Sequence, residues 1–228
     1  RMKVSFDELS KMGVVAIERI DFTGNQAGKA YVLDADGPRI LNEDFSQAPE
    51  VIWARDPANR GKIYQGPIVL QPNGDHKTPF MIMATPVYEE SVDESHPRAT
   101  GNLDGVLLFK IDLSRFTGHY CANIRSGRTG YCWVMDNKGT FLYHPEREFI
   151  GEDAFTARGQ RDPAISFAAI NEIQKTKMLK GEEGTATYIS GWHRGVIRQM
   201  DKFVAYTNSH VGAACPYSHL SRSDIDAS

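Results

Sequence analysis

The two halves of the chain carry the same order of segments, and this repeat constrains the fold more than any other feature. Each half shows a pair of strand-like segments, a helical segment and then three further strands. The closing segment of the first half, residues 105–115, is paralleled by residues 212–222 in the second. The repeat predicts an α+β chain of two mixed modules, each with a five-stranded antiparallel sheet flanked by helices.

The expected strands are short apolar or alternating runs that end at Gly, Pro, Asn or Asp. They cover residues 14–20, 30–33, 62–70, 80–88 and 105–111 in the first half, and 131–135, 141–144, 185–189, 202–207 and 211–215 in the second. The segment Asp136-Asn-Lys-Gly139 has the composition of a hairpin turn. Helices are expected over 45–53, 114–124 and 163–179, the last with apolar residues at a 3.6-residue period.

Composition and charge exclude several classes of protein. The chain has 228 residues, enough for one large or two small domains, with 41% hydrophobic and 24% charged residues, so a folded core is expected. The formal net charge of −3 lacks the basic excess of a nucleic-acid binder, so no nucleic-acid partner is predicted. No run approaches the ~20 apolar residues of a membrane span.

Catalytic and metal-binding motifs are missing from the sequence. There is no Gly-x-Ser-x-Gly, His-Glu-x-x-His or P-loop, and no Cys/His spacing typical of zinc, so neither a metal nor a cofactor is predicted. The three cysteines, Cys121, Cys132 and Cys215, are most simply buried small hydrophobes. A stand-alone hydrolase or redox enzyme that uses Cys121 or Cys132 stays open as an alternative.

One stretch of the second half is similar to a known family. Residues 127–145 read Gly-x-x-Gly-Tyr, an apolar strand, Asp-x-x-Gly and a second strand that ends in His144-Pro145, and Ile150-Gly151 follows. This pattern resembles the membrane-proximal module of double-Cache sensor domains. Residues 63–68, 83–88 and 105–113 resemble the membrane-distal module, so the resemblance covers about residues 13–222.

The resemblance implies a fold, a function and a location. It implies two tandem PAS-like modules, a distal one over residues 1–113 and a proximal one over 127–228, joined by a linking helix at 114–126. It also implies a non-enzymatic, periplasmic or extracellular sensor domain of a bacterial or archaeal receptor, either a sensor histidine kinase or a chemoreceptor. Such a receptor is anchored in the membrane by the parent protein, and a homodimer is compatible with it.

The ligand site is expected in the distal module. A site for a small carboxylate needs a cation and aromatic walls that exclude water. Trp53, Tyr64 and Tyr88 supply the walls, and Arg60 and Asp112 are the expected charged contacts. In the amino-acid-binding branch of the family, an Arg-x-Trp-Tyr-like motif and an Asp fall at Arg60, Tyr64 and Asp112. Lys62-Ile63 replaces the Trp, so an α-amino acid is not specifically supported among organic acids, amino acids and amines.

The proximal module offers a second set of candidates. Its members are aromatic residues that share the strands of this half, together with one histidine: Tyr131, Trp133, Tyr143, Tyr188 and His144. The simpler interpretation of Tyr131 and Trp133 is core packing, and that of His144 is a cap on the loop that Pro145 turns. A sensor that holds haem non-covalently is a further alternative, because covalent attachment would need Cys-x-x-Cys-His.

Overall fold

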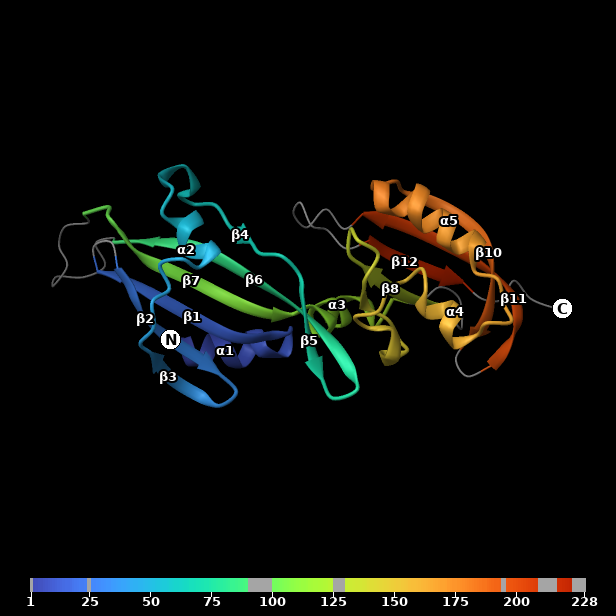
Figure 1. Cartoon of the computed structure of the whole chain (residues 1–228), viewed down its shortest axis with the longest axis horizontal. Helices are drawn as coiled ribbons and strands as arrows, with labels where there is room; N and C mark the ends of the chain where they lie inside the picture. The colour runs from blue at the N-terminus through green and yellow to red at the C-terminus, as the bar shows by residue number, and fades with distance from the viewer. Residues whose placement is uncertain are drawn as a thin grey trace. The chain divides into compact units, whose positions relative to one another are not determined.

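The chain folds into two compact units, each with its own sheet and core (Figure 1). The computed structural model describes residues 2–23, 26–89, 100–124, 130–193, 196–208 and 217–222. The first unit comprises Arg1–Val69 and Phe80–Asp112, and the second comprises Leu70–Pro79 and Leu113–Ser228. Residues 70–79 therefore group with the second unit, where Lys77 pairs with Glu152 at 3.2 Å.

The first sheet has seven strands instead of the five predicted, in the order β3-β2-β1-β7-β6-β4, with β5 paired to β6. Its strands are β1 (Val14–Thr23), β2 (Gln26–Asp34), β3 (Gly37–Leu41), β4 (Tyr64–Gln65), β5 (Val69–Asn73), β6 (His76–Tyr88) and β7 (Leu103–Asp112). The sequence missed β3 because Gly37, Pro38 and Arg39 are poor strand formers. The expected strand 62–70 divides into β4 and β5 at Gly66-Pro67, since proline cannot donate a ladder hydrogen bond.

The core of the first unit lies on one face of this sheet, beneath α2 (Pro49–Ala54). Val51 and Ala54 of α2 pack with Ile20 of β1 and Leu108 of β7 in one buried cluster. The helix is shorter than the predicted 45–53 because Pro49 occupies its first turn, where a missing N–H costs nothing. Helix α1 (Met2–Lys11) precedes β1, and the 3₁₀ turn η1 (Pro57–Asn59) follows α2.

Gly105 is required where β7 crosses β1. A Cβ atom at this position would overlap the carbonyl oxygen of Ile20, a backbone atom that cannot rotate away. We expect Gly105→Ala to destabilise the protein by about 2 kcal/mol or more, the range for overpacking. Gly28→Ala is the control, because nothing lies within 4 Å of its added methyl group. Urea unfolding of both variants tests this, and equal midpoints would show that β1 and β7 are not packed this closely.

The second sheet has five antiparallel strands in the order β10-β11-β12-β8-β9, as the sequence predicted for this half. The strands are β8 (Tyr131–Met135), β9 (Phe141–Tyr143), β10 (Gly184–His193), β11 (Val196–Asn208) and β12 (Tyr217–Arg222). The expected strand 211–215 lies outside the described residues, and β12 closes the sheet between β11 and β8. The hairpin at Asp136 is confirmed, because its carboxylate accepts from the N–H groups of Lys138 (2.9 Å) and Thr140 (2.8 Å).

The helices of the second unit are shorter than predicted. They are α3 (Leu113–Cys121), α4 (Ala157–Arg161) and α5 (Ala168–Thr176), with 3₁₀ turns η2 (Arg147–Phe149) and η3 (Met178–Lys180). The predicted helix 163–179 begins only at Ala168, because residues 163–167 form turns and irregular backbone instead of helix. It ends at Thr176 because Lys177 leaves the helical region.

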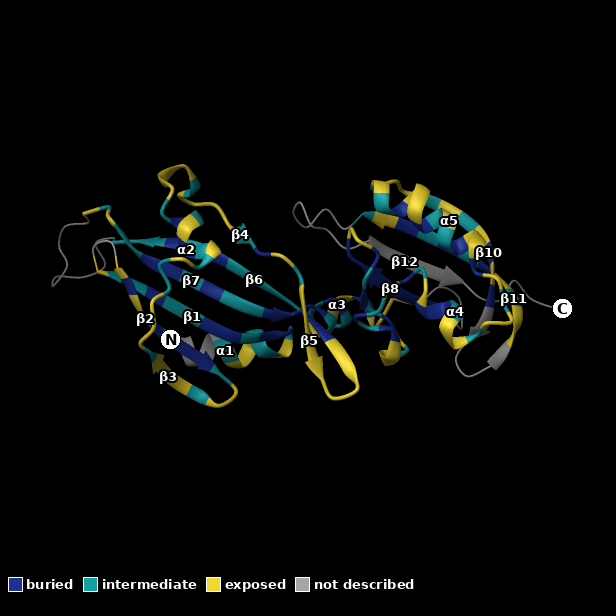
Figure 2. Ribbon diagram, in the orientation of Figure 1, coloured by how far each residue is buried: buried dark blue, intermediate teal, exposed yellow. Residues whose placement is uncertain are grey.

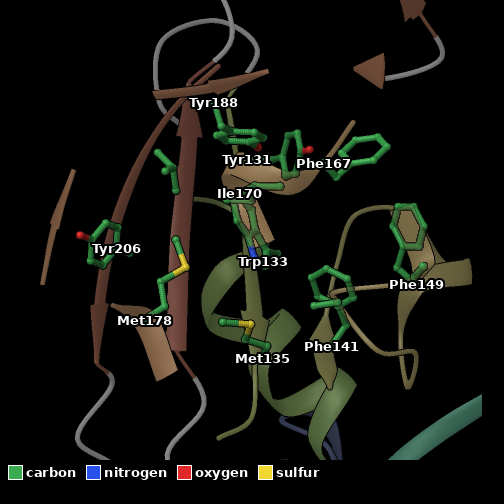
Figure 3. Packing of buried hydrophobic residues seen from close by; sticks show 13 residues of the cluster. Tyr131, Trp133, Met135, Phe141, Phe149, Phe167, Ile170, Met178, Tyr188 and Tyr206 are labelled. Carbon is green, nitrogen blue, oxygen red and sulfur yellow. The ribbon is translucent and has the colours of Figure 1, made fainter. Parts of the chain in front are cut away.

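The core of the second unit is rich in aromatic residues (Figure 3). Strand β8 is buried at every position (Figure 2), and Trp133 at its centre has only 1% of its surface exposed. Tyr131, Phe141 and Phe167 belong to the same cluster. The interpretation of Tyr131 and Trp133 as core residues is confirmed.

Candidate functional site

Two of the three aromatic residues expected to wall a distal site, Trp53 and Tyr64, meet at one end of α2. Trp53 of α2 and Tyr64 of β4 have ring centroids 5.6 Å apart with their planes tilted by 52°, and both pack against the core of the first unit. The side-chain amide of Asn59 donates to the carbonyl of Trp53 at 2.8 Å, which fixes the end of the helix. Burial and the Glu50 carboxylate raise the pKa of Tyr64, so its hydroxyl stays protonated.

The two expected charged contacts, Arg60 and Asp112, lie apart from each other. The exposed Arg60 places its guanidinium 4.3 Å from the centroid of the Tyr88 ring. Asp112 is buried at the far end of β7, where it pairs with Phe80, whereas Tyr88 pairs with Leu103. Nine residues along one strand span about 30 Å. Asp112 and the Arg60–Tyr88 pair therefore cannot contact the same small molecule, which corrects the site predicted from the sequence.

Two charged residues that the sequence analysis missed lie on the core side of the first sheet. Strand alternation places Glu18 on the same face as Ile20, and Lys110 on the same face as Leu108 and Asp112. Glu18 pairs with Leu108 across β1 and β7, and Lys110 pairs with Ala16 and Ile82. Ionisable groups of both signs therefore project from the central strands toward the side covered by α2.

The charges on this face influence one another. The pKa of Glu18 is raised mainly by burial, while Lys110 lowers it and Glu50 of α2 raises it. The ammonium of Lys110 lies 4.7 Å from the centroid of the Phe80 ring, a cation–π distance. All three charged side chains are half-buried. The pattern could have been found in the sequence, since a lysine interrupts the apolar run at an inward position of a strand.

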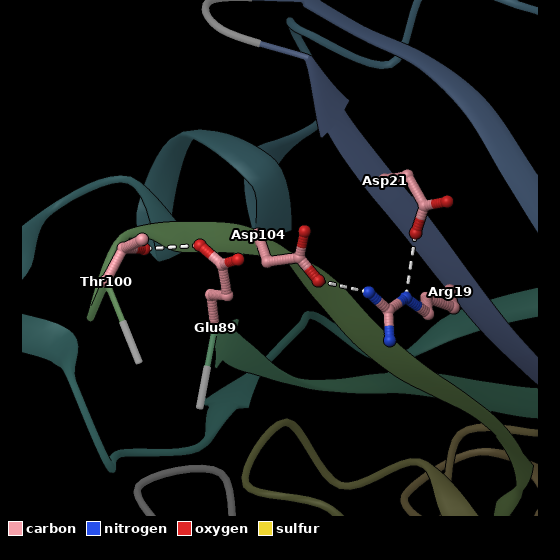
Figure 4. A network of polar contacts seen from close by, with 5 residues as sticks. All are labelled: Arg19, Asp21, Glu89, Thr100 and Asp104. Carbon is pink, nitrogen blue, oxygen red and sulfur yellow. Dashed lines mark hydrogen bonds and ion pairs between the residues drawn. The ribbon is translucent and has the colours of Figure 1, made fainter. Parts of the chain in front are cut away.

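The first unit carries a second polar network (Figure 4). Arg19 follows Glu18 in β1, so its side chain lies on the opposite face of the sheet. Its guanidinium pairs with Asp21 (2.7 Å) and with Asp104. The Thr100 hydroxyl donates to Glu89 close by. About a third or more of each of the three paired side chains is exposed, so water screens these ion pairs and they add little stability.

The candidates in the second unit are mostly core residues. Tyr131, Trp133 and Tyr188 are buried, whereas Tyr143 is half-buried against Gly118 of α3 and lies outside the core cluster. His144 is buried, and its Nδ1 accepts a hydrogen bond from the Glu146 N–H at 3.0 Å, so its expected role as a loop cap is confirmed.

Two buried cations accompany these aromatic residues, and no pattern in the sequence indicated them. Arg158 of α4 has 5% of its surface exposed and Lys202 of β11 has 2%. Their positions depend on the packing of a five-residue helix and on the register of β11, neither of which a hydrophobic pattern specifies. The burial of both residues can therefore be seen only in the folded structure.

Cys215 lies outside the described residues, and the two described cysteines do not form an accessible nucleophilic site. Cys121 at the end of α3 and Cys132 in β8 are both buried. A hydrogen bond with the Cys132 thiol holds the pKa of Cys121 below its ordinary value. Burial of both sulfur atoms counts against an enzyme that attacks a substrate through either one.

The chain belongs to the Cache domain family, whose model matches residues 14–216. Cache domains are extracytoplasmic sensor domains and are in general not enzymes. No curated protein sequence matches the chain. Among the described residues, no helix is both long enough and apolar enough to cross a membrane.

Solved structures share this fold at low sequence identity. The periplasmic sensory domain of the Campylobacter jejuni chemoreceptor Tlp1 has a TM-score of 0.53 and 12% identity, over 96% of this chain and 75% of that one. The extracellular domain of a candidate histidine kinase has a TM-score of 0.57 and 14% identity, over 97% and 74%. The Pseudomonas aeruginosa chemoreceptor PctC, solved with GABA, has a TM-score of 0.50 and 14% identity, over 92% and 75%.

Proposed function

We propose that this chain is the ligand-sensing part of a transmembrane signal-transduction receptor, either a histidine kinase or a chemoreceptor. Membership of the Cache family and the likeness to sensory domains of both receptor types support this proposal. The two separate sheets support a tandem, double-Cache arrangement of a distal and a proximal module. In such a receptor the ligand drives signalling only by as much as it discriminates between two conformations.

The ligand site is proposed in the first unit, between α2 and the sheet. The observation that carries this proposal is the pair of opposite charges, Glu18 and Lys110, on the face of the central strands that also forms the apolar core of the unit. Half-buried charges on central strands are costly and rare in a core that serves packing alone. Trp53 and Tyr64 add an aromatic wall on the same side.

The charges favour a small molecule that carries both an amine and a carboxylate. Lys110 would meet the carboxylate, and Glu18 the amine. Among organic acids, amino acids and amines, a molecule with both groups can contact both protein charges, whereas a simple acid or amine can contact only one of them. The GABA bound in the related chemoreceptor PctC is of this class.

A thermal-shift screen tests the proposed function. A ligand that binds only the native state increases the free energy of unfolding, by about 2.7 kcal/mol when its concentration is a hundred times its Kd. The melting temperature rises as a result. We expect hits among amino acids with separated charges, and weaker or no shifts for the corresponding acids and amines. A full set of these compounds that leaves the melting temperature unchanged would contradict the proposal.

Removal of the Lys110 charge is expected to weaken the binding of the best ligand from the screen. Lys110→Met keeps the aliphatic stem but deletes a charge-assisted hydrogen bond, worth about 1.5–3 kcal/mol or roughly ten- to a hundred-fold in affinity. Lys11→Met is the matched control, because Lys11 is exposed on α1. Calorimetric titration of both variants checks this, and equal affinities would remove Lys110 from the site.

A further inference from the structure

The second unit buries two positive charges in one aromatic core. Arg158 and Lys202 expose 5% and 2% of their surfaces, which puts them among the most buried residues of the unit. A charge taken out of water costs several kcal/mol unless opposite charge or strong hydrogen bonds offset it. Two like charges in one core raise the cost of burial further. The groups around Arg158 and Lys202 show how far the chain itself offsets this cost.

The partners of Arg158 are neutral. Its Nη1 donates to the carbonyl of Ala154 at 2.8 Å and to Oε1 of Gln174 at 3.0 Å. Gln174 is fully buried, and its Nε2 lies 3.3 Å from the sulfur of Met135, so the glutamine is held in place. Among the described residues no carboxylate pairs with Arg158. The guanidinium is therefore positioned firmly but its charge is not neutralised.

Aromatic rings line both cations. The Arg158 guanidinium lies 5.0 Å from the ring centroid of Phe141 and 5.7 Å from that of Trp133. The Lys202 ammonium lies 3.2 Å from the hydroxyl of Tyr131 and 5.3 Å from the centroid of its ring. Tyr188 lies directly opposite Lys202, across β10 and β11.

The titrating groups of this core all respond to positive charge. Burial and then Arg158 lower the pKa of Lys202 to about 7. Burial, then Arg158 and Lys202, hold the pKa of His144 well below its usual value. Burial raises the pKa of Tyr188, so its hydroxyl stays protonated. Neither Tyr188 nor His144 therefore adds negative charge near neutral pH.

We propose that the second unit binds a small organic carboxylate between Arg158 and Lys202, with Tyr131 and Tyr188 as hydrogen-bonding walls. The guanidinium supplies paired donors that match a carboxylate, and the ammonium supplies a second charge. The rings of Phe141 and Trp133 favour a ligand with an apolar body over inorganic phosphate. This site is separate from the one proposed in the first unit and does not depend on it.

Calorimetric titration of the whole chain with acetate, propionate and butyrate tests this inference, each beside its uncharged amide. We expect at least one carboxylate to bind, its amide and inorganic phosphate to bind about tenfold more weakly or worse, and Arg158→Met and Lys202→Met to lose about tenfold each. Lys175→Met, an exposed change in the same unit, and Lys11→Met, an exposed change in the first unit, should leave the affinity unchanged. Binding of no carboxylate, or equal binding of acid and amide, would overturn the proposal.

A second measurement covers the case in which the variants do not fold. A bound carboxylate should raise the pKa of Lys202, so the wild-type chain should take up a fraction of a proton on binding at about pH 8. Titration in two buffers of different ionisation enthalpy measures this uptake. Binding without proton uptake, or binding abolished by Lys110→Met, would place the carboxylate elsewhere and overturn the proposal.

Discussion

Replacement of Trp133 by alanine is expected to cost about 3–5 kcal/mol of unfolding free energy, the range for deleting a buried aromatic ring. Trp133 is 1% exposed at the centre of β8, with the Tyr131 ring 6.1 Å away and the Arg158 guanidinium 5.7 Å away. The change removes both the buried apolar area and an aromatic face that a buried cation contacts. Few single substitutions in this chain should be as damaging.

Urea unfolding followed by circular dichroism measures this loss. Tyr120→Ala is the control in the same unit, because Tyr120 of α3 is 56% exposed and its deletion leaves the core intact. We expect the control to shift the midpoint only slightly. If Trp133→Ala unfolded at the same urea concentration as Tyr120→Ala, the aromatic cluster would not be the core of the second unit.

Stability is expected to rise with pH because of Lys202. Its pKa is lowered to about 7 in the folded chain, against ~10.4 for an unfolded lysine. Between these values the unfolded state binds more protons, so the unfolding free energy should increase by up to about 1.4 kcal/mol per pH unit. Below pH ~7 both states carry the charge, and this contribution is lost.

His144 adds to the same trend at lower pH. Burial and the two cations hold its pKa well below the usual value, so it stays neutral in the folded chain where it would be protonated in the unfolded one. Its contribution is present above pH ~6.5 and is lost as the pH falls below that value. The free energy of unfolding should therefore decline as the pH falls, first through the neutral and then through the mildly acidic range.

Unfolding curves collected from about pH 5 to pH 9 test this pH dependence, with Lys202→Met as the comparison. The methionine keeps the stem but cannot titrate, so the slope above pH ~7 should disappear while the slope from His144 remains. A wild-type chain whose stability is flat from pH 7 to pH 9 would show that Lys202 is not buried as a titrating group.

Hydrophobic patterns predicted the central strands of the sheets but not all of the strands at their edges. β1, β7 and β8 combine apolar runs with turn residues at their ends, so local pattern and burial agree. The edge strand β3 contains Gly37 and Pro38, and β4 has only two residues, so neither shows a period of two. Their pairing depends on neighbouring strands that bring the backbone into register, which is information outside the local sequence.

The candidate site could be predicted only in part for a related reason. Trp53 and Tyr64 come together because they flank a short connection, and this proximity can be read along the chain. Glu18 and Lys110 are more than ninety residues apart and meet only through the register of β1 and β7. Asp112 was misplaced because its distance from Tyr88 depends on how far β6 and β7 run together.

Hydrogen–deuterium exchange with and without the best ligand of the thermal screen tests the sensor account most directly. Groups that a ligand contacts open less often, so their backbone amides exchange more slowly. We expect slower exchange in Pro49–Ala54 of α2, in Tyr64–Gln65 of β4 and in the part of β7 around Lys110. Unchanged exchange in all three segments, with binding confirmed by calorimetry, would contradict a ligand site in the first unit.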